Sequence, residues 1–155
     1  GCGILSEAYP IRETAEYIRK ELSKPLAEGL AIALNGEITG FGWGYRLGGK
    51  EFAITKYSAA ESQKMIGSIV GEETIFFYVS EVGVIPQLQG KGLGFRITST
   101  LARYGSLNNL PILMRTNSES PMVRIARKLS MTEVLGPNST KPDPENPKRI
   151  LFTKL

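Results

Sequence analysis

The first third of the chain carries the hydrophobic pattern of a helix followed by a hairpin. Apolar residues recur every three or four positions between residues 10 and 24, and this spacing predicts one buried face of a helix. The residues on that face are Ile11, Ala15, Ile18 and Leu22. Pro10 suits the first turn of such a helix, and Pro25 ends it.

Asn35-Gly36 lies between the apolar segments 30–34 and 37–46 and predicts a two-residue hairpin turn. The second strand alternates glycine with aromatic residues, with Gly40, Gly42 and Gly44 on one face and Phe41, Trp43 and Tyr45 on the other. A bare face usually indicates that another backbone, a helix or a ligand packs closely against it. The alternative is an aromatic core on one side and a strand merely weakened by glycine on the other.

The remainder of the chain alternates strand-like and helix-like segments after a less regular insert at residues 46–73. We expect a short helix over 59–70, a buried strand over 75–85, a helix beginning at Leu93, a strand over 110–115, a helix opened by Ser120-Pro121, an extended proline-rich loop over 137–147 and a closing strand over 149–155. This order predicts one domain spanning residues 1–155, of the mixed α/β (α+β) class.

The composition of the chain excludes several kinds of catalytic and metal site. The 155 residues include no histidine and a single cysteine, Cys2. A disulfide framework, a Cys/His zinc site and a catalytic Ser-His or Cys-His pair are therefore excluded. Any general base must be a carboxylate, a tyrosine, a lysine or a chain of water molecules, and we expect no metal.

Charge is divided unevenly along the sequence. Residues 1–80 hold 8 basic and 10 acidic side chains, whereas residues 81–155 hold 11 basic and 5 acidic ones. The basic second half suits a polyanionic ligand, either a nucleic acid or a phosphorylated small molecule. No apolar run approaches the roughly 18 residues of a membrane span, and residues 1–5 lack the features of a signal peptide. We therefore expect a soluble, reduced, cytoplasmic protein with no membrane partner.

A glycine-rich segment ahead of the helix at Leu93 holds the strongest candidate chemistry. Successive glycines let backbone N–H groups converge on one point, and a helix N-terminus adds partial positive charge, so such a segment can hold a pyrophosphate. The spacing of Gly90, Gly92 and Gly94 fits neither a Walker A loop nor the dinucleotide-binding fingerprint. A glycine-rich turn that binds nothing is the alternative.

The same segment resembles the GNAT superfamily of N-acetyltransferases. Gln89-Gly90-Lys91-Gly92-Leu93-Gly94 matches that family's Q/R-x-x-G-x-G/A signature, and Val82-Gly83-Val84-Ile85-Pro86 is similar to the strand motif that precedes it. The resemblance covers residues 11–155. It implies a mostly antiparallel central sheet flanked by helices, with acetyl-CoA as the acyl donor.

The resemblance also assigns residues to acetyl-CoA. Backbone groups of Val82, Gly83 and Val84 would bind the pantetheine arm as an added strand. The pyrophosphate would be held by the amides of Gln89, Gly90, Lys91, Gly92, Leu93, Gly94 and Phe95. Lys91 and Arg96 would add positive potential, and Asn117 matches an asparagine that the family often places beside the cofactor.

For catalysis, the resemblance implies direct attack of an amine on the thioester, with a backbone N–H near Val82 polarising the carbonyl. Glu81 would be the base, with Tyr78 or Ser80 assisting through water; an ordinary strand-edge glutamate is the alternative for Glu81. The family's acid tyrosine is replaced here by Ala126, in the run Ala126-Arg127-Lys128-Leu129-Ser130-Met131. Tyr104 and Tyr9 are the candidates to substitute for it.

Three functional hypotheses follow. The first is an N-acetyltransferase that transfers acetyl from acetyl-CoA to an unidentified small-molecule or peptide amine. The second is a non-catalytic acyl-CoA-binding or sensing domain of the same fold. The third, a nucleic-acid-binding module, is disfavoured because Phe76, Phe77 and Tyr78 lie in an apolar strand without interleaved basic residues.

Further expectations concern the loops, the N-terminal residues and the edges of the sheet. The insert and the proline-rich loop should line the acceptor site, because loops on a rigid scaffold carry specificity. The family's opening strand is short or missing at residues 1–5. Exposed sheet edges in this architecture would allow a homodimer.

Overall fold

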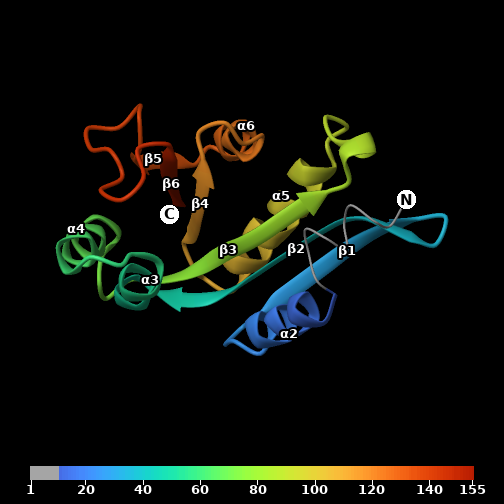
Figure 1. Ribbon diagram of the computed structural model, residues 1–155, viewed down its shortest axis with the longest axis horizontal. Helices are drawn as coiled ribbons and strands as arrows, with labels where there is room; N and C mark the ends of the chain where they lie inside the picture. Colours follow the sequence, from blue (N-terminus) through green and yellow to red (C-terminus); the bar gives the residue numbers. More distant parts are fainter. Residues whose placement is uncertain (1–10) are drawn as a thin grey trace.

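Six strands form one mixed sheet in the order β1-β2-β3-β4-β6-β5 (Figure 1). The computed structural model describes residues 11–155. Their elements are α2 (Ile11–Leu22), β1 (Glu28–Leu34), β2 (Glu37–Gly48), α3 (Gly49–Lys56), α4 (Ala60–Val70), β3 (Ile75–Val84), the short 3-10 turn η1 (Pro86–Leu88), α5 (Leu93–Leu107), β4 (Ile112–Asn117), α6 (Met122–Lys128), β5 (Thr132–Leu135) and β6 (Arg149–Lys154).

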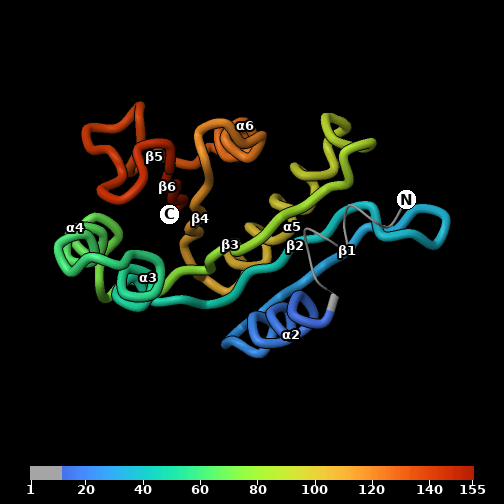
Figure 2. The backbone as a smooth tube through the Cα atoms, viewed as in Figure 1, coloured from blue at the N-terminus to red at the C-terminus, as the bar shows by residue number. Residues whose placement is uncertain are grey.

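Neighbouring strands are antiparallel except for β3 and β4, which run parallel. This arrangement confirms the predicted mixed, mostly antiparallel sheet. The backbone in Figure 2 shows that β3 and β4 start close together, near α3, and then diverge. The sheet therefore consists of two halves that separate at its centre.

Close packing of α5 explains the bare glycine face of β2. A Cβ at Gly42 would lie 2.5 Å from Cγ2 of Ile97 and 3.2 Å from Cδ1 of Leu101, both on α5. A Cβ at Gly40 would also lie only 3.0 Å from Ile97. The glycines thus let a helix approach the strand, which confirms the first of the two interpretations of this pattern. The hairpin is also confirmed, since Asn35 and Gly36 both have positive φ.

Each face of the sheet has its own hydrophobic core. On one face, Phe77, Val79, Ile112 and Met114 pack against α5 and α6. On the other face, the buried aromatic residues Tyr45, Phe52, Phe76 and Tyr78 join side chains of α3 and α4. The insert at residues 46–73 therefore supplies half of the buried residues of this second core as well as covering the surface.

Three sequence predictions need correction. No strand was expected over Thr132–Leu135 and no helix over Gly49–Lys56, although both are present. β5 has only four residues, too few to show a strand pattern in the sequence, and its hydrogen-bonded pairing with β6 stabilises it. On α2, Leu22 is 42% exposed whereas Glu21 is 3% exposed, because the carboxylate of Glu21 points inward and accepts a hydrogen bond from Ser80 of the sheet.

Some predictions concern residues that the structure does not describe. The predictions for Cys2, Tyr9, Pro10 and the opening strand lie outside residues 11–155. Within that range, no helix has the length and apolar character needed to cross a bilayer. The same residues contain no group of three or more Cys, Asp or Glu placed to hold a metal ion.

Candidate functional site

The site begins where β3 and β4 separate. The two strands pair only through Phe77–Ile112, Tyr78–Leu113 and Val79–Met114, whereas β3 continues to pair with β2 as far as Val84. The β4-facing edge of β3 therefore has no strand partner beyond Val79 among residues 11–155. A groove of about 210 Å³ fills the gap. Its lining residues are Val79, Ser80, Glu81, Val82, Met114, Arg115, Thr116, Ser120 and Met122.

A β-bulge turns two polar residues of β3 to the same side. Trp43 of β2 is opposite Glu81, but the next residue of β2 is opposite Val79, so Ser80 is the extra residue. Such a bulge bends the strand and redirects its side chains. Val79 and Val82 pack toward α5, which leaves Ser80 and Glu81 on the opposite face, beside α2.

The glycine turn leaves backbone N–H groups free to bind a ligand. Gly90 and Gly92 have φ of 79° and 84°, in the left-handed region that glycine tolerates. Gly92 is the N-cap of α5, so the N–H groups of the first helical turn, from Leu93 to Phe95, have no intrahelical acceptor. A Cβ at Gly90 or Gly92 would meet no heavy atom within 4 Å, and the turn is therefore open on that side.

Gln89 fixes this turn to the end of β3. Its side-chain Nε2 donates to the carbonyl of Val84 at 3.1 Å, and its backbone N–H donates to Pro86 at 3.4 Å. The N–H of Ile85 donates to the carbonyl of Thr39, on β2, at 2.9 Å. Backbone groups alternate along a strand, so those of Val82 and Val84 point to the open edge.

Gly83 has a different environment. By the same alternation its backbone groups point toward β2, and a Cβ there would lie 2.6 Å from Cζ of Phe41. Gly83 therefore allows an aromatic ring to pack on the strand. Its predicted contact with a cofactor stays a prediction, as do those of Gln89, Gly90, Lys91, Gly92, Leu93, Gly94 and Phe95.

Solved structures with this architecture match the chain at low sequence identity. Arabidopsis thaliana NAA60 with a bisubstrate analogue superimposes with a TM-score of 0.61 at 16% identity, over 97% of this chain and 87% of that chain. A GNAT family acetyltransferase from Elizabethkingia anophelis with acetyl-CoA bound gives 0.55 at 15% identity, over 90% and 82%. The polyamine N-acetyltransferase of Drosophila melanogaster gives 0.52 at 16% identity, over 82% and 74%.

The chain has the GNAT N-acetyltransferase fold. No family model matches the sequence, and no curated protein matches it either. The resemblance stated from the glycine motif is therefore confirmed at the level of the fold. These structural neighbours are acetyl-CoA-dependent N-acetyltransferases.

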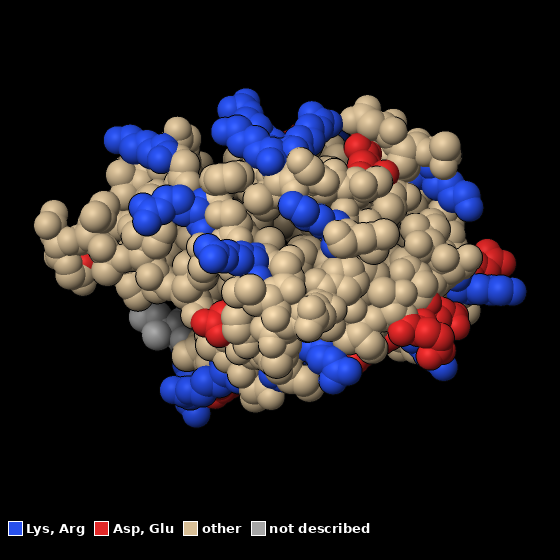
Figure 3. All heavy atoms as spheres, turned by 180° about the vertical axis from the view of Figure 1, so that it is seen from behind, with Lys and Arg blue, Asp and Glu red and all other residues tan. Residues whose placement is uncertain are grey.

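The face of the molecule formed by α5 and α6, beside the groove, is basic. Figure 3 shows lysine and arginine side chains gathered along the upper part of the face opposite to the view of Figure 1, where α5 and α6 lie. The exposed basic residues of these two helices are Arg96, Arg103, Arg124, Arg127 and Lys128. Lys91 lies in the glycine turn and Arg96 in the first turn of α5, and the other basic residues extend the positive potential over α5 and α6.

A buried carboxylate lies on the other face, and sequence reasoning missed it. Glu21 of α2 accepts hydrogen bonds from Ser80 Oγ at 2.8 Å and Tyr17 Oη at 3.1 Å, and it pairs with Lys24. Burial alone would raise the pKa of Glu21, but the bonds from Lys24, Ser80 and Tyr17 lower it below its ordinary value. Burial and the Glu21 charge raise the pKa of Tyr17 to about 12.

Glu81 lines the groove and is close enough to Glu21 to feel its charge. Partial burial and the charge of Glu21 raise the pKa of Glu81, against the opposing effect of Lys56. Lys56 Nζ lies 5.3 Å from the ring centroid of Tyr78, and burial, with Arg115 nearby, lowers the pKa of Lys56. Burial also raises the pKa of Tyr78, so its phenol stays protonated. The catalytic assignments of Glu81 and Tyr78 stay predictions.

The acid position of the family motif faces the core. Ala126 is fully buried between α6 and the sheet, and Tyr104 packs edge-to-face on Phe77 at 5.4 Å between centroids. Neither residue lines the groove, whose hydroxyl groups come from Ser80, Thr116 and Ser120. Ser130, in the same run as Ala126, has φ of 59° and thus adopts the left-handed conformation.

Asn117 lies at the end of β4, outside the groove. Its Oδ1 accepts a hydrogen bond from the Glu119 N–H at 2.9 Å, and its side chain lines a second, smaller pocket with Arg115 and Arg149. No local sequence pattern indicates this pocket, because its residues come from β4, β6 and the proline-rich loop. The predicted role of Asn117 beside the cofactor stays a prediction.

Proposed function

We propose that this protein is an N-acetyltransferase that transfers acetyl from acetyl-CoA directly to an amine. The observation that carries the proposal is the continuity of three features along β3. The bulge at Ser80 and Glu81 is followed by the unpaired edge of Val82 and Val84, and this edge leads to the glycine turn at the N-terminus of α5. A thioester arm bound along that edge would extend from the pyrophosphate cradle to the carboxylates.

Backbone groups would supply most of the binding. The N–H groups of Val82 and Val84 and the C=O group of Val82 would pair with the amides of the pantetheine arm, as in strand addition. The amides from Gly90 to Phe95 would hold the pyrophosphate, helped by the positive end of α5. Gln89 would hold the cradle in register with β3 through its bond to Val84.

The acceptor nitrogen would attack the thioester carbonyl carbon, the carbon–sulfur bond would break, and the CoA thiolate would leave. The amine loses its proton to Glu81, directly or through a water at Ser80. A carboxylate with a raised pKa is a better proton acceptor than an ordinary surface glutamate. The thiolate is a fair leaving group, so the reaction proceeds without a tyrosine at position 126, although more slowly.

Calorimetry and thiol release test the proposal together. Acetyl-CoA and CoA are titrated into the protein, and release of free CoA thiol is then measured with primary amines, polyamines and peptides with free N-termini. Binding followed by amine-dependent thiol release is expected. The buried Ala126 favours one competing function, a non-catalytic acyl-CoA sensor, and tight binding without thiol release from any amine would support it.

Other outcomes separate the remaining alternatives. Retention on DNA that survives saturating acetyl-CoA would instead indicate a nucleic-acid-binding module. Cytoplasmic location and a homodimeric state stay predictions, which cell fractionation and light scattering test.

A further inference from the structure

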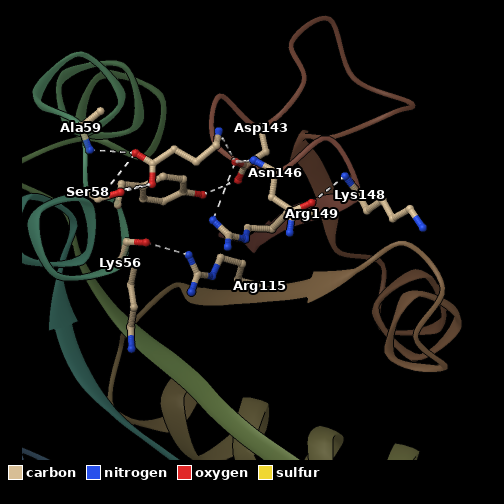
Figure 4. A network of polar contacts seen from close by, with 10 residues as sticks. Lys56, Ser58, Ala59, Arg115, Asp143, Asn146, Lys148 and Arg149 are labelled. Carbon is tan, nitrogen blue, oxygen red and sulfur yellow. Dashed lines mark hydrogen bonds and ion pairs between the residues drawn. The ribbon is translucent and has the colours of Figure 1, made fainter.

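A pocket of about 90 Å³ adjoins the groove on the side away from β3. It is lined by Arg115, Thr116, Asn117, Asn146 and Arg149, and the first two of these also line the groove. Figure 4 shows Arg115 and Arg149 side by side, with Asn146 from the proline-rich loop next to them. A ligand in the groove therefore has direct access to a second polar site.

Apart from the Thr116 hydroxyl, which can donate or accept, the free side-chain polar groups that line this pocket are donors. The Oδ1 atoms of both asparagines are already occupied, since Asn117 accepts from Glu119 at 2.9 Å and Asn146 accepts from Lys148 at 3.0 Å. Their Nδ2 groups and the two guanidinium groups remain. A guanidinium has only N–H donors and no acceptor. The lining thus suits an anion and not a cation.

The two arginines are held in place by Tyr57. Each guanidinium carbon lies 5.5 Å from the centroid of the Tyr57 ring, within the range of a cation–π interaction. Arg115 Nη1 also donates to the carbonyl of Lys56 at 3.0 Å. The guanidinium groups are therefore positioned before a ligand arrives.

Asp143 forms a long ion pair with the nearby Arg149 but no hydrogen bond. Its carboxylate accepts hydrogen bonds from Tyr57 Oη at 2.7 Å and from the N–H groups of Glu145 and Asn146, both at 2.9 Å. Arg149 Nη1 is 3.8 Å from Asp143 Oδ1, and this buried nitrogen has no hydrogen-bond partner in the described part of the chain. An unpaired buried donor is costly, and an anion in the pocket would satisfy it.

Opposite charges therefore lie on the two sides of the site: Glu81 lines the groove on the β3 side, and Arg115 and Arg149 line the pocket on the β4–β6 side. We infer that the acceptor is an amine that also carries an anionic group, a carboxylate or a phosphate, bound in the Arg115–Arg149 pocket. This inference rests on the proposed acetyltransferase function. Glu81 and Arg149 lie on strands separated by β4, and two strand spacings amount to about 10 Å. Because β3 has already diverged from β4 at Glu81, the two side chains start from backbones farther apart than this, so several bonds must separate nitrogen and anion.

Matched acceptors test the inference on the wild-type protein. Thiol release is compared for ω-aminohexanoate, ω-aminohexyl phosphate, the neutral ω-aminohexanamide and hexylamine. We expect kcat/KM about ten- to a hundredfold higher for one of the anionic acceptors than for the neutral pair, the size of a charge-assisted hydrogen bond. The carboxylate and phosphate arms identify the anion. Equal or higher values for hexylamine would overturn the inference.

Arginine variants locate the effect. Arg149→Met should reduce the preference for the anionic acceptor to about threefold or less, through the KM of that acceptor and not that of acetyl-CoA, and Arg149→Lys should restore part of it. Lys64→Met, at an exposed position of α4 that lines neither the groove nor the pocket, is the control for loss of one positive charge. A rise in the KM of acetyl-CoA instead would assign the pocket to the cofactor and overturn the inference.

Binding measurements keep this outcome separate from the proposed function. If no amine supports thiol release, the acetyltransferase function fails. Calorimetry with ω-aminohexanoate and hexylamine then still reports on the pocket: stronger binding of the anion, lost in Arg149→Met, supports an anion site, and no difference removes it.

Discussion

At the scale of single residues, two glycines with the same backbone conformation separate ligand binding from folding. Gly92 and Gly36 have φ of 84° and 79°, and a Cβ at either would meet no heavy atom within 4 Å. Only Gly92 lies at the N-terminus of a long helix. A side chain should therefore strain both turns to a similar degree, about 1–2 kcal/mol, but disturb a phosphate at only one.

We predict that Gly92→Glu weakens CoA binding by at least about a hundredfold, because it places a side chain and a negative charge where the pyrophosphate should lie. Gly36→Glu should lower the melting temperature similarly while changing CoA affinity less than about twofold. Calorimetric titration and thermal melts measure the two effects. Unchanged CoA affinity in Gly92→Glu would remove the phosphate assignment of the turn.

A second residue-scale prediction concerns Glu81. Burial and Glu21 raise the pKa of its carboxyl group, and a general base acts only when deprotonated, so kcat/KM should increase with pH through that raised pKa. Glu81→Gln should lower kcat/KM by about 10²–10⁴-fold and remove this limb of the profile. Glu73→Gln, an exposed change in the insert, is the control. A Glu81→Gln profile that keeps the limb would make Glu81 an ordinary strand glutamate.

At the scale of elements, local signals were sufficient where one segment determines its own structure. The Asn35-Gly36 turn, the buried strand of β3 and the glycine turn before α5 could all be predicted, because turn geometry and periodicity are local. α3 and β5 could not, since an eight-residue helix and a four-residue strand depend on tertiary partners. Burial of Glu21 in place of Leu22 depends on Ser80, a residue far along the chain.

The contact of α2 with β3 gives a prediction at this scale. Glu21 is 3% exposed and joins the two elements through Ser80. Glu21→Gln should reduce the free energy of unfolding by about 2 kcal/mol at neutral pH, the size of hydrogen bonds to a charged group. Glu16→Gln on the same helix, which loses only an exposed pair with Arg12 at 3.6 Å, should cost less than about 0.5 kcal/mol.

The pH dependence of this difference has a definite sign. The folded-state pKa of Glu21 is lowered, so its stabilisation is complete above the unfolded carboxyl value of about 4.3 and is lost as the pH falls through the lower folded value. Urea denaturation of the wild type and Glu21→Gln at several pH values should show the gap closing in acid. A gap that is constant from neutral pH to acid would show that the charge of Glu21 is not what stabilises the contact.

At the scale of the whole molecule, the two sides of the site differ in how far the sequence predicts them. The proposed cofactor side is contiguous, from β3 through the glycine turn into α5, and its motif is readable. The proposed acceptor side combines Glu21 of α2, Lys56 of α3, Arg115 of β4 and Arg149 of β6, which no local pattern connects. The sequence does show the overall imbalance of charge, with the basic residues concentrated after residue 80.

That imbalance leads to a prediction about salt. Positive potential over α5 and α6 (Figure 3) should attract the phosphates of acetyl-CoA, and salt shortens the range of this attraction from about 10 Å at 0.1 M to about 3 Å at 1 M. Over that range we expect acetyl-CoA affinity to decrease about three- to tenfold. The affinity for acetyl-pantetheine, which on this proposal would bind the β3 edge but has no phosphate, should change less than about twofold. An equal decrease for both ligands, measured by titration, would mean that the basic half of the chain does not contribute to cofactor binding.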